Sequence, residues 1–99
     1  MAFKKHFRFN KLVNHPAYIF KEENGLCYYF FVTHQKKWKN IKNIPLTGPL
    51  KRNDLKKNYL VPLILKAKPD RFQDQAAKHL KFHRADGPLI RELYKKYKV

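Results

Sequence analysis

The sequence contains no serine, a single cysteine and only seven acidic residues, and each shortage excludes a kind of chemistry. Without serine the chain cannot build a serine-based catalytic triad. The lone Cys27 allows neither an intramolecular disulfide nor a cysteine-based zinc site. Because the acidic residues are scattered, we expect no carboxylate cluster of the kind that hard metal ions require, and hence no metal nuclease.

Long apolar runs and glycine-rich loops are also missing. No segment is long enough to span a membrane, and the first residues, MAFKKHFRFNKLV, lack the apolar run of a secretory signal. We therefore expect a cytoplasmic protein with no membrane partner. No glycine-rich phosphate loop is present, which argues against nucleotide hydrolysis, and we expect no cofactor.

Positive charge dominates what the sequence does contain. Its 23 lysines and arginines oppose seven acidic residues and give a formal net charge of +16 over 99 residues. An excess of this size predicts a polyanionic partner, because a basic protein gains affinity by releasing the counterions of phosphates. RNA is the first expectation and DNA the second, and the plain alternative is a surface that is basic only through frequent lysine usage.

A β-hairpin is the strongest structural signal. Residues 17–23, AYIFKEE, and residues 26–33, LCYYFFVT, flank the dipeptide Asn24–Gly25, which tolerates the positive φ angles of a tight turn. The second run is apolar on both faces and predicts a central strand. Cys27 lies in this run, so we expect a buried and unreactive thiol.

The rest of the chain predicts shorter elements. We expect a loop over residues 34–40, a short strand at 43–46, a basic loop at 47–58 and a strand over 58–66 that Pro62 places at an edge or a bulge. A last short strand is predicted at 80–84. Asp86 suits the N-cap of a C-terminal helix over residues 86–97, in which Leu89, Leu93 and Tyr97 share one stripe.

These elements predict a single α+β domain over residues 1–99, a small SH3-like antiparallel β-barrel with a C-terminal α-helix. Two interpretations of residues 1–15 stay open. Phenylalanines alternate there with basic residues, so the segment is either an arm that stacks on bases or an extra strand of the core.

Candidate catalytic residues gather around the hairpin. RNA is cut without a metal when a base removes the 2′-hydroxyl proton, an acid protonates the leaving oxygen and a cation stabilises the phosphorane. His15 precedes the first strand and His34 follows the second, so antiparallel pairing brings both to one end of the sheet. Thr33 adds a hydroxyl and Lys36 a cation. The alternative is that these four residues only contact phosphate or water.

The segment from Phe30 to Arg52 contains five lysines and no acidic residue, and it predicts a nucleic-acid-binding surface. Trp38 lies inside it, and its indole either stacks on a base or folds back onto the barrel. The predicted binding residues are Lys37, Trp38, Lys39, Lys42, Lys51, Arg52, Lys56 and Lys57.

The segment YYFFVTHQKKW, after HPAYIF as a first strand, resembles the L-T-S-P-K-K type segment that ends a core strand in the ToxN and AbiQ toxins of type III toxin–antitoxin systems. These small endoribonucleases belong to the wider MazF/PemK-like superfamily and have an SH3-like barrel. The resemblance covers roughly residues 14–65. It implies that Thr33 matches the family's active-site threonine and that Lys36 or Lys37 matches its lysine.

The chain departs from that pattern at the two positions after Thr33. His34 replaces the family's serine and no proline follows, so either His34 takes over proton transfer or the chain keeps the binding surface without cleavage. The same layout, with HPAYI, THQ and KNIPL, also resembles small proteins of Gram-positive bacteria and their mobile elements that imply no particular function.

Three functions follow as expectations. The first is an RNA-binding, metal-independent endoribonuclease of toxin type that cleaves single-stranded RNA, for which the resemblance implies an antitoxin of RNA or acidic protein. The second is a non-catalytic SH3-like module that binds RNA or DNA with the same loops. The third is an interaction protein whose basic face docks an acidic partner.

Overall fold

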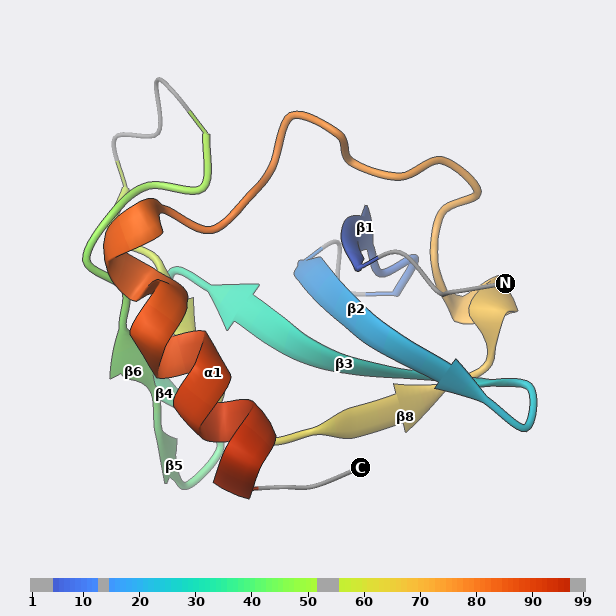
Figure 1. Ribbon diagram of the computed structural model, residues 1–99, viewed down its shortest axis with the longest axis horizontal. Helices are drawn as coiled ribbons and strands as arrows, with labels where there is room; N and C mark the ends of the chain where they lie inside the picture. Colours follow the sequence, from blue (N-terminus) through green and yellow to red (C-terminus); the bar gives the residue numbers. More distant parts are fainter. Residues whose placement is uncertain (1–4, 13–14, 52–55, 97–99) are drawn as a thin grey trace.

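The computed structural model describes residues 5–12, 15–51 and 56–96. It shows a mostly antiparallel sheet with one C-terminal helix, so the predicted α+β class is confirmed (Figure 1). The path of paired strands is β1 (His6–Phe9), β2 (Pro16–Glu23), β3 (Leu26–Thr33), β7 (Tyr59–Leu60) and β6 (Ile44–Pro45). No pairing between described residues joins β1 to β6, so this sheet is not closed into a barrel.

The predicted hairpin is present with its predicted turn. β2 pairs with β3 in antiparallel register, with Ala17 opposite Phe31 and Glu23 opposite Leu26. Asn24 and Gly25 have φ angles of 55° and 76°, which is the left-handed backbone that the dipeptide predicts. A register shift between Ile19 and Lys21 introduces an irregularity in β2.

β3 is the central strand, as predicted. Its first half pairs with β8 (Leu65–Ala67), and its last residues pair with β7. The predicted strand over 58–66 is therefore split in two at Val61–Ile64. Pro62 lies in this break, because its ring nitrogen has no proton to donate to a ladder.

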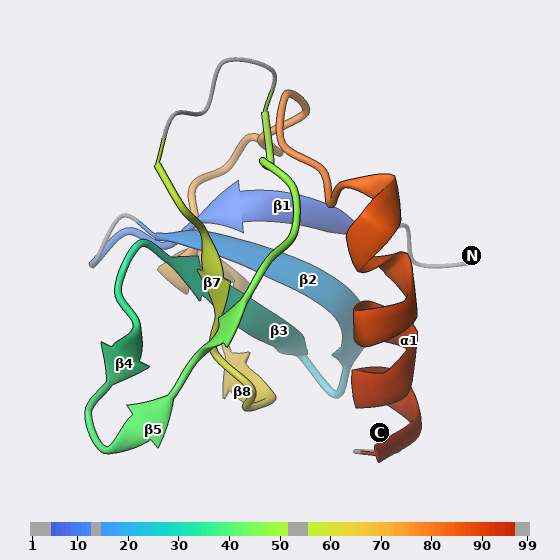
Figure 2. The same ribbon diagram turned by 90° about the vertical axis from the view of Figure 1, so that its left-hand side faces the viewer.

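Apolar side chains cover both faces of β3, and each face belongs to a separate core. Phe30 packs with Leu60, Leu46 and the helix residues Ile90 and Leu93 on one face. On the other face, Tyr29 and Phe31 pack with Ile19, Val61 and Phe72. Successive strand residues point to opposite faces, which explains why the uninterrupted run LCYYFFV is needed. The helix α1 (Gly87–Lys96) packs against the first face (Figure 2).

The N-terminal segment is part of the sheet, so the arm interpretation is wrong for residues 6–9. β1 pairs with β2, and Phe7 is 2% exposed within the core. The outer edge of β1 is occupied, because the amides of Gln73 and Ala77 donate to the carbonyls of Phe9 and Phe7. Residues 1–4 and 13–14 of the predicted arm lie outside the described residues.

Two further expectations need correction. The predicted loop after Thr33 contains β4 (Lys37–Trp38), which pairs with β5 (Ile41–Lys42) in a small separate sheet. Residues 80–83 form no strand, and residues 84–86 form the 3-10 helix η2 (Arg84–Asp86) before α1. Another 3-10 helix, η1 (Pro69–Arg71), follows β8. No helix in the described part of the chain has the length and apolar character needed to cross a membrane.

The helix begins at Gly87, and Asp86 does not cap it in the predicted way. The carboxylate of Asp86 instead accepts hydrogen bonds from the backbone amides of Thr47 and Gly48. Leu93 is buried and Leu89 partly buried on the helix, as the predicted stripe requires. Tyr97 lies outside the described residues.

Candidate nucleic-acid interface

The predicted catalytic residues lie at the open end of the β2–β3 hairpin, away from the Asn24–Gly25 turn. Ala17 pairs with Phe31, so the chain just before β2 meets the chain at the end of β3. His15 lies there with its ring 6.2 Å from the ring of Phe31. The predicted placement of His15, Thr33 and His34 at one end of the sheet is therefore confirmed.

Thr33 is built into the fold rather than presented to solvent. Its side chain is buried, at 5% exposure, and its hydroxyl oxygen accepts a hydrogen bond of 3.3 Å from the amide of Gln35. His34 and Lys36 are exposed on the turn that follows, and His15 is half-buried. Among the described residues no side-chain hydrogen bond joins these four groups, so they share a location without forming a proton relay.

The β4–β5 hairpin follows directly and carries four of the predicted binding residues. Lys37 pairs with Lys42 and Trp38 with Ile41, with Lys39 and Asn40 as the two-residue loop. Lys39 has a φ of 56°, which is the left-handed conformation that such a short loop demands. Lys37, Lys39 and Lys42 are all exposed.

Asn43 fixes the base of this hairpin, a role that the sequence alone did not reveal. Its amide donates to the carbonyl of Lys36 at 2.9 Å, and its side-chain amide donates to the carbonyl of Gln35 at 3.0 Å. The side chain is 3% exposed. An Asn after a strand-like segment signals a turn in general, but the closure across Gln35 and Lys36 depends on how the chain folds back.

Trp38 is neither fully exposed for stacking on a base nor fully folded back onto the core. It is half-buried, with its ring 6.3 Å from the ring of Phe31 in an edge-to-face contact. The ammonium group of Lys39 lies 5.0 Å from the centroid of the indole. The indole therefore caps one core while part of it remains accessible beside a cation.

The remaining predicted binding residues lie on a different part of the molecule. Lys51, Lys56 and Lys57 are exposed on the segments that border residues 52–55. Figure 2 shows these segments at the opposite end of the view from β4 and β5. Arg52 lies outside the described residues. The predicted binding set is thus divided between two surfaces.

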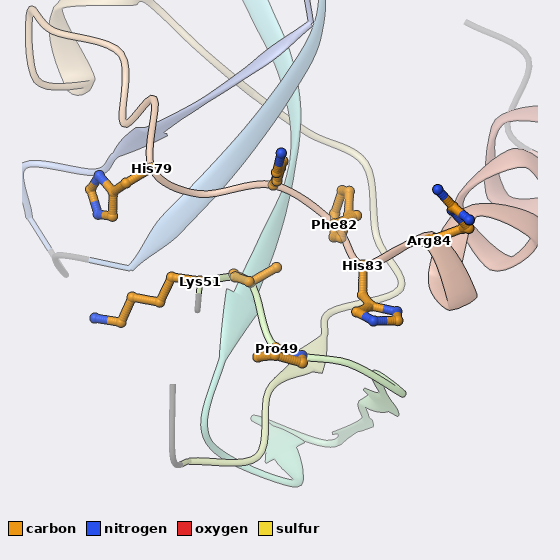
Figure 3. A pocket seen from close by; sticks show the side chains of 8 residues that line it. Pro49, Lys51, His79, Phe82, His83 and Arg84 are labelled. Carbon is orange, nitrogen blue, oxygen red and sulfur yellow. The ribbon is translucent and has the colours of Figure 1, made fainter. Parts of the chain in front are cut away.

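A groove of about 760 Å³ lies on the second surface, and of the predicted residues there it includes Lys51 but not Lys56 or Lys57 (Figure 3). It is lined by Pro49, Leu50, Lys51, His79, Lys81, Phe82, His83 and Arg84. Of these, only Lys51 belongs to the set of binding residues predicted from the sequence. The signal for the others is the alternation in HLKFHR, in which His79, Lys81 and His83 are separated by the apolar Leu80 and Phe82. That alternation predicted a strand, and what it marks is one extended wall of the groove.

The two walls of the groove are tied together at their base. The amide of Lys81 donates to the carbonyl of Leu50 at 3.0 Å. The carboxylate of Asp86 accepts from Thr47 at 2.7 Å and from Gly48 at 3.0 Å. Asp86 is 2% exposed, so its charge is directed at these amides and is not offered to the groove.

Cys27 belongs to the core, as predicted. Its side chain is 4% exposed in the core that also contains Phe72. Burial raises the pKa of its thiol above the ordinary value of 9.0, the Glu22 carboxylate raises this pKa further, and Arg8 opposes the increase. The thiol therefore stays protonated and unreactive near neutral pH.

Comparison of the chain with protein-family models, with curated proteins and with solved structures finds no match. Within residues 5–12, 15–51 and 56–96, no group of three or more histidine, cysteine, aspartate or glutamate side chains is placed to hold a metal ion.

Proposed function

We propose that this protein binds single-stranded RNA through its basic surface. The observation that supports this most directly is the exposure of Lys36, Lys37 and Lys42 on and beside the β4–β5 hairpin. In the described parts of the chain no carboxylate forms an ion pair with any of these three lysines. When such lysines neutralise the phosphates of a nucleic acid, they release the cations condensed on it, and this release favours binding.

A single strand fits this surface better than a duplex. The half-exposed indole of Trp38, with Lys39 beside it, offers an unpaired base a stacking platform next to a phosphate contact. The bases of a duplex are already stacked and would leave this platform unused. RNA is preferred over DNA because of the resemblance to the toxins of type III systems.

Metal-independent cleavage is the second candidate, and the register of the β2–β3 hairpin favours it. It places His15 and His34 at one strand end, where one imidazole takes the 2′-hydroxyl proton, the other protonates the leaving oxygen and Lys36 stabilises the phosphorane. Since Thr33 is buried and bonded to Gln35, its role in this proposal is to hold the turn. This second candidate function also includes an SH3-like fold, a relationship to the MazF/PemK-like toxins and an antitoxin as partner.

The test is a titration of nucleic-acid-free protein with a labelled single-stranded RNA at several salt concentrations. If the basic surface binds phosphates, log affinity falls linearly with log salt, by a slope of about 0.7 per phosphate contact. The same RNA incubated in EDTA reports cleavage, which must yield more product than protein. A protein that binds neither RNA nor DNA at moderate salt, but retains an acidic polypeptide, is an interaction protein.

A further inference from the structure

We propose that the groove between Pro49–Lys51 and His79–Arg84 is a second RNA contact, which holds the sugar–phosphate backbone of the strand bound at the β4–β5 hairpin. This inference rests on the proposed function and extends it to a groove of which the acid-free segment supplies only one wall, Pro49–Lys51. It predicts that the bound strand contacts two separate parts of the molecule.

The charge of the groove selects an anion. Lys51, Lys81 and Arg84 contribute three cations, and none of the described residues that line the groove is acidic. Asp86, two residues after Arg84, is buried and accepts hydrogen bonds from two backbone amides. The positive charge is therefore uncompensated in the groove itself, and a chain of phosphates is its complement.

The apolar part of the groove selects a nucleotide strand over a simple inorganic anion. Leu50, Pro49 and Phe82 line it together with the cations. Phe82 is anchored, because its ring lies 5.0 Å from Phe7 and 4.7 Å from Tyr18. In Figure 3, Lys51 and His79 lie at one end, and His83 and Arg84 lie at the other, with Phe82 between them. Separated cations with an apolar surface between them suit alternating phosphates and bases.

The histidines act as hydrogen-bond donors in this proposal and not as an acid–base pair. The amide of Ala85 donates to Nδ1 of His83 at 3.1 Å, so the proton of the neutral imidazole resides on Nε2. That N–H is available to a phosphate oxygen. Figure 3 shows His79 and His83 at opposite ends of the segment that links them, so in this proposal each of them makes a separate contact.

The groove is preorganised, which reduces the entropy lost on binding. Its walls come from segments about thirty residues apart in sequence, and they are joined by the Lys81–Leu50 hydrogen bond and by the Asp86 carboxylate. Gly48 is part of this arrangement, since a Cβ atom built at this position would overlap the ring of His83. Only glycine lets the two walls approach this closely.

The test compares two double variants by titration with a fluorescein-labelled oligouridine long enough to reach both surfaces, roughly 16 nucleotides. The groove variant is Lys51→Ala with Lys81→Ala. The control is Lys68→Ala with Lys95→Ala, two exposed lysines outside the groove. Each variant lowers the formal net charge of +16 by two, so the two variants differ in where charge is removed and not in how much.

We expect the groove variant to lower the salt slope by about 1.4, twice the 0.7 of a single-strand phosphate contact, and the control to leave it unchanged. Gly48→Ala, checked for folding by circular dichroism, should weaken binding as well, because it displaces His83. Equal effects of the groove variant and the control on an RNA-binding wild type would overturn this inference alone. A wild type that binds no RNA overturns the proposed function with it, and retention of poly-glutamate by the groove would reassign it to a protein partner.

Discussion

Asp86 and Gly48 are joined across 38 positions of sequence by a hydrogen bond of 3.0 Å from the glycine amide to Oδ2 of the aspartate. The other carboxylate oxygen accepts from Thr47 at 2.7 Å. One buried side chain thereby connects the turn before α1 to the loop that follows β6. This connection sets the position of both walls of the basic groove.

The first prediction concerns this connection. Asp86→Asn places an NH₂ group against one of two backbone amides, so one hydrogen bond is lost and the other loses its charge. We expect the free energy of unfolding to fall by about 1.5–3 kcal/mol, the usual range for buried hydrogen bonds to a charged group. Urea denaturation measures this change. The exposed Asp74→Asn serves as control and should be neutral, and equal stability of the two variants would show that the Asp86 contact is not formed.

The second prediction separates binding from cleavage at the hairpin end. His34→Ala should leave the affinity for RNA nearly unchanged, because a neutral imidazole adds little to a surface of +16. If His34 transfers a proton, the cleavage rate should fall by about 10²–10⁴-fold. The neighbouring exposed Gln35→Ala is the matched control. Cleavage that survives both His34→Ala and His15→Ala would exclude this end of the sheet as the active site.

The third prediction tests the lysines of the acid-free segment. Lys36→Ala with Lys37→Ala should weaken binding to single-stranded RNA and lower the salt slope by about 0.7 for each phosphate that the variant no longer binds. Both side chains are exposed, so the fold should be unaffected. A salt slope equal to that of wild type in the same titration would mean that these two lysines do not contact phosphates.

The fourth prediction concerns Cys27. Cys27→Val should alter the free energy of unfolding by only about 1 kcal/mol, as expected for a small core substitution, and should leave RNA binding intact. In the native wild type a thiol reagent at pH 8 should react far more slowly than in denaturant, because the thiol is buried and its pKa is raised. Rapid labelling of the folded protein would contradict this placement.

The fifth prediction follows from raised pKa values in the core. Burial raises the pKa of Tyr29 above 10.0 and that of Cys27 above 9.0, so the folded state keeps both protons to a higher pH than the unfolded state does. Their contribution to stability is complete below about pH 9 and is lost as the pH rises through the raised values. Denaturant titrations at increasing alkaline pH should show this fall, and Cys27→Val should remove the cysteine part of it.

The sequence by itself determined the features whose causes are local. Asn24–Gly25 has few alternatives to a tight turn, and the run LCYYFFVT must be covered on both faces, so the β2–β3 hairpin and its central strand could be predicted. The turn sets the register only as far as Lys21, where an irregularity shifts it, but antiparallel pairing still places His15 and His34 at one end of the sheet. The net charge of +16 and the acid-free segment can likewise be read from the sequence alone.

Only the tertiary structure decided what each polar group contacts. The sequence position of Asp86 suits an N-cap. In the structure its carboxylate instead accepts hydrogen bonds from the backbone amides of Thr47 and Gly48. Thr33 ends an apolar strand, yet its burial depends on packing by segments remote in sequence. The groove unites Pro49–Lys51 with His79–Arg84, and no local pattern predicts that pairing, because it depends on which segments meet when two cores form on opposite faces of one strand.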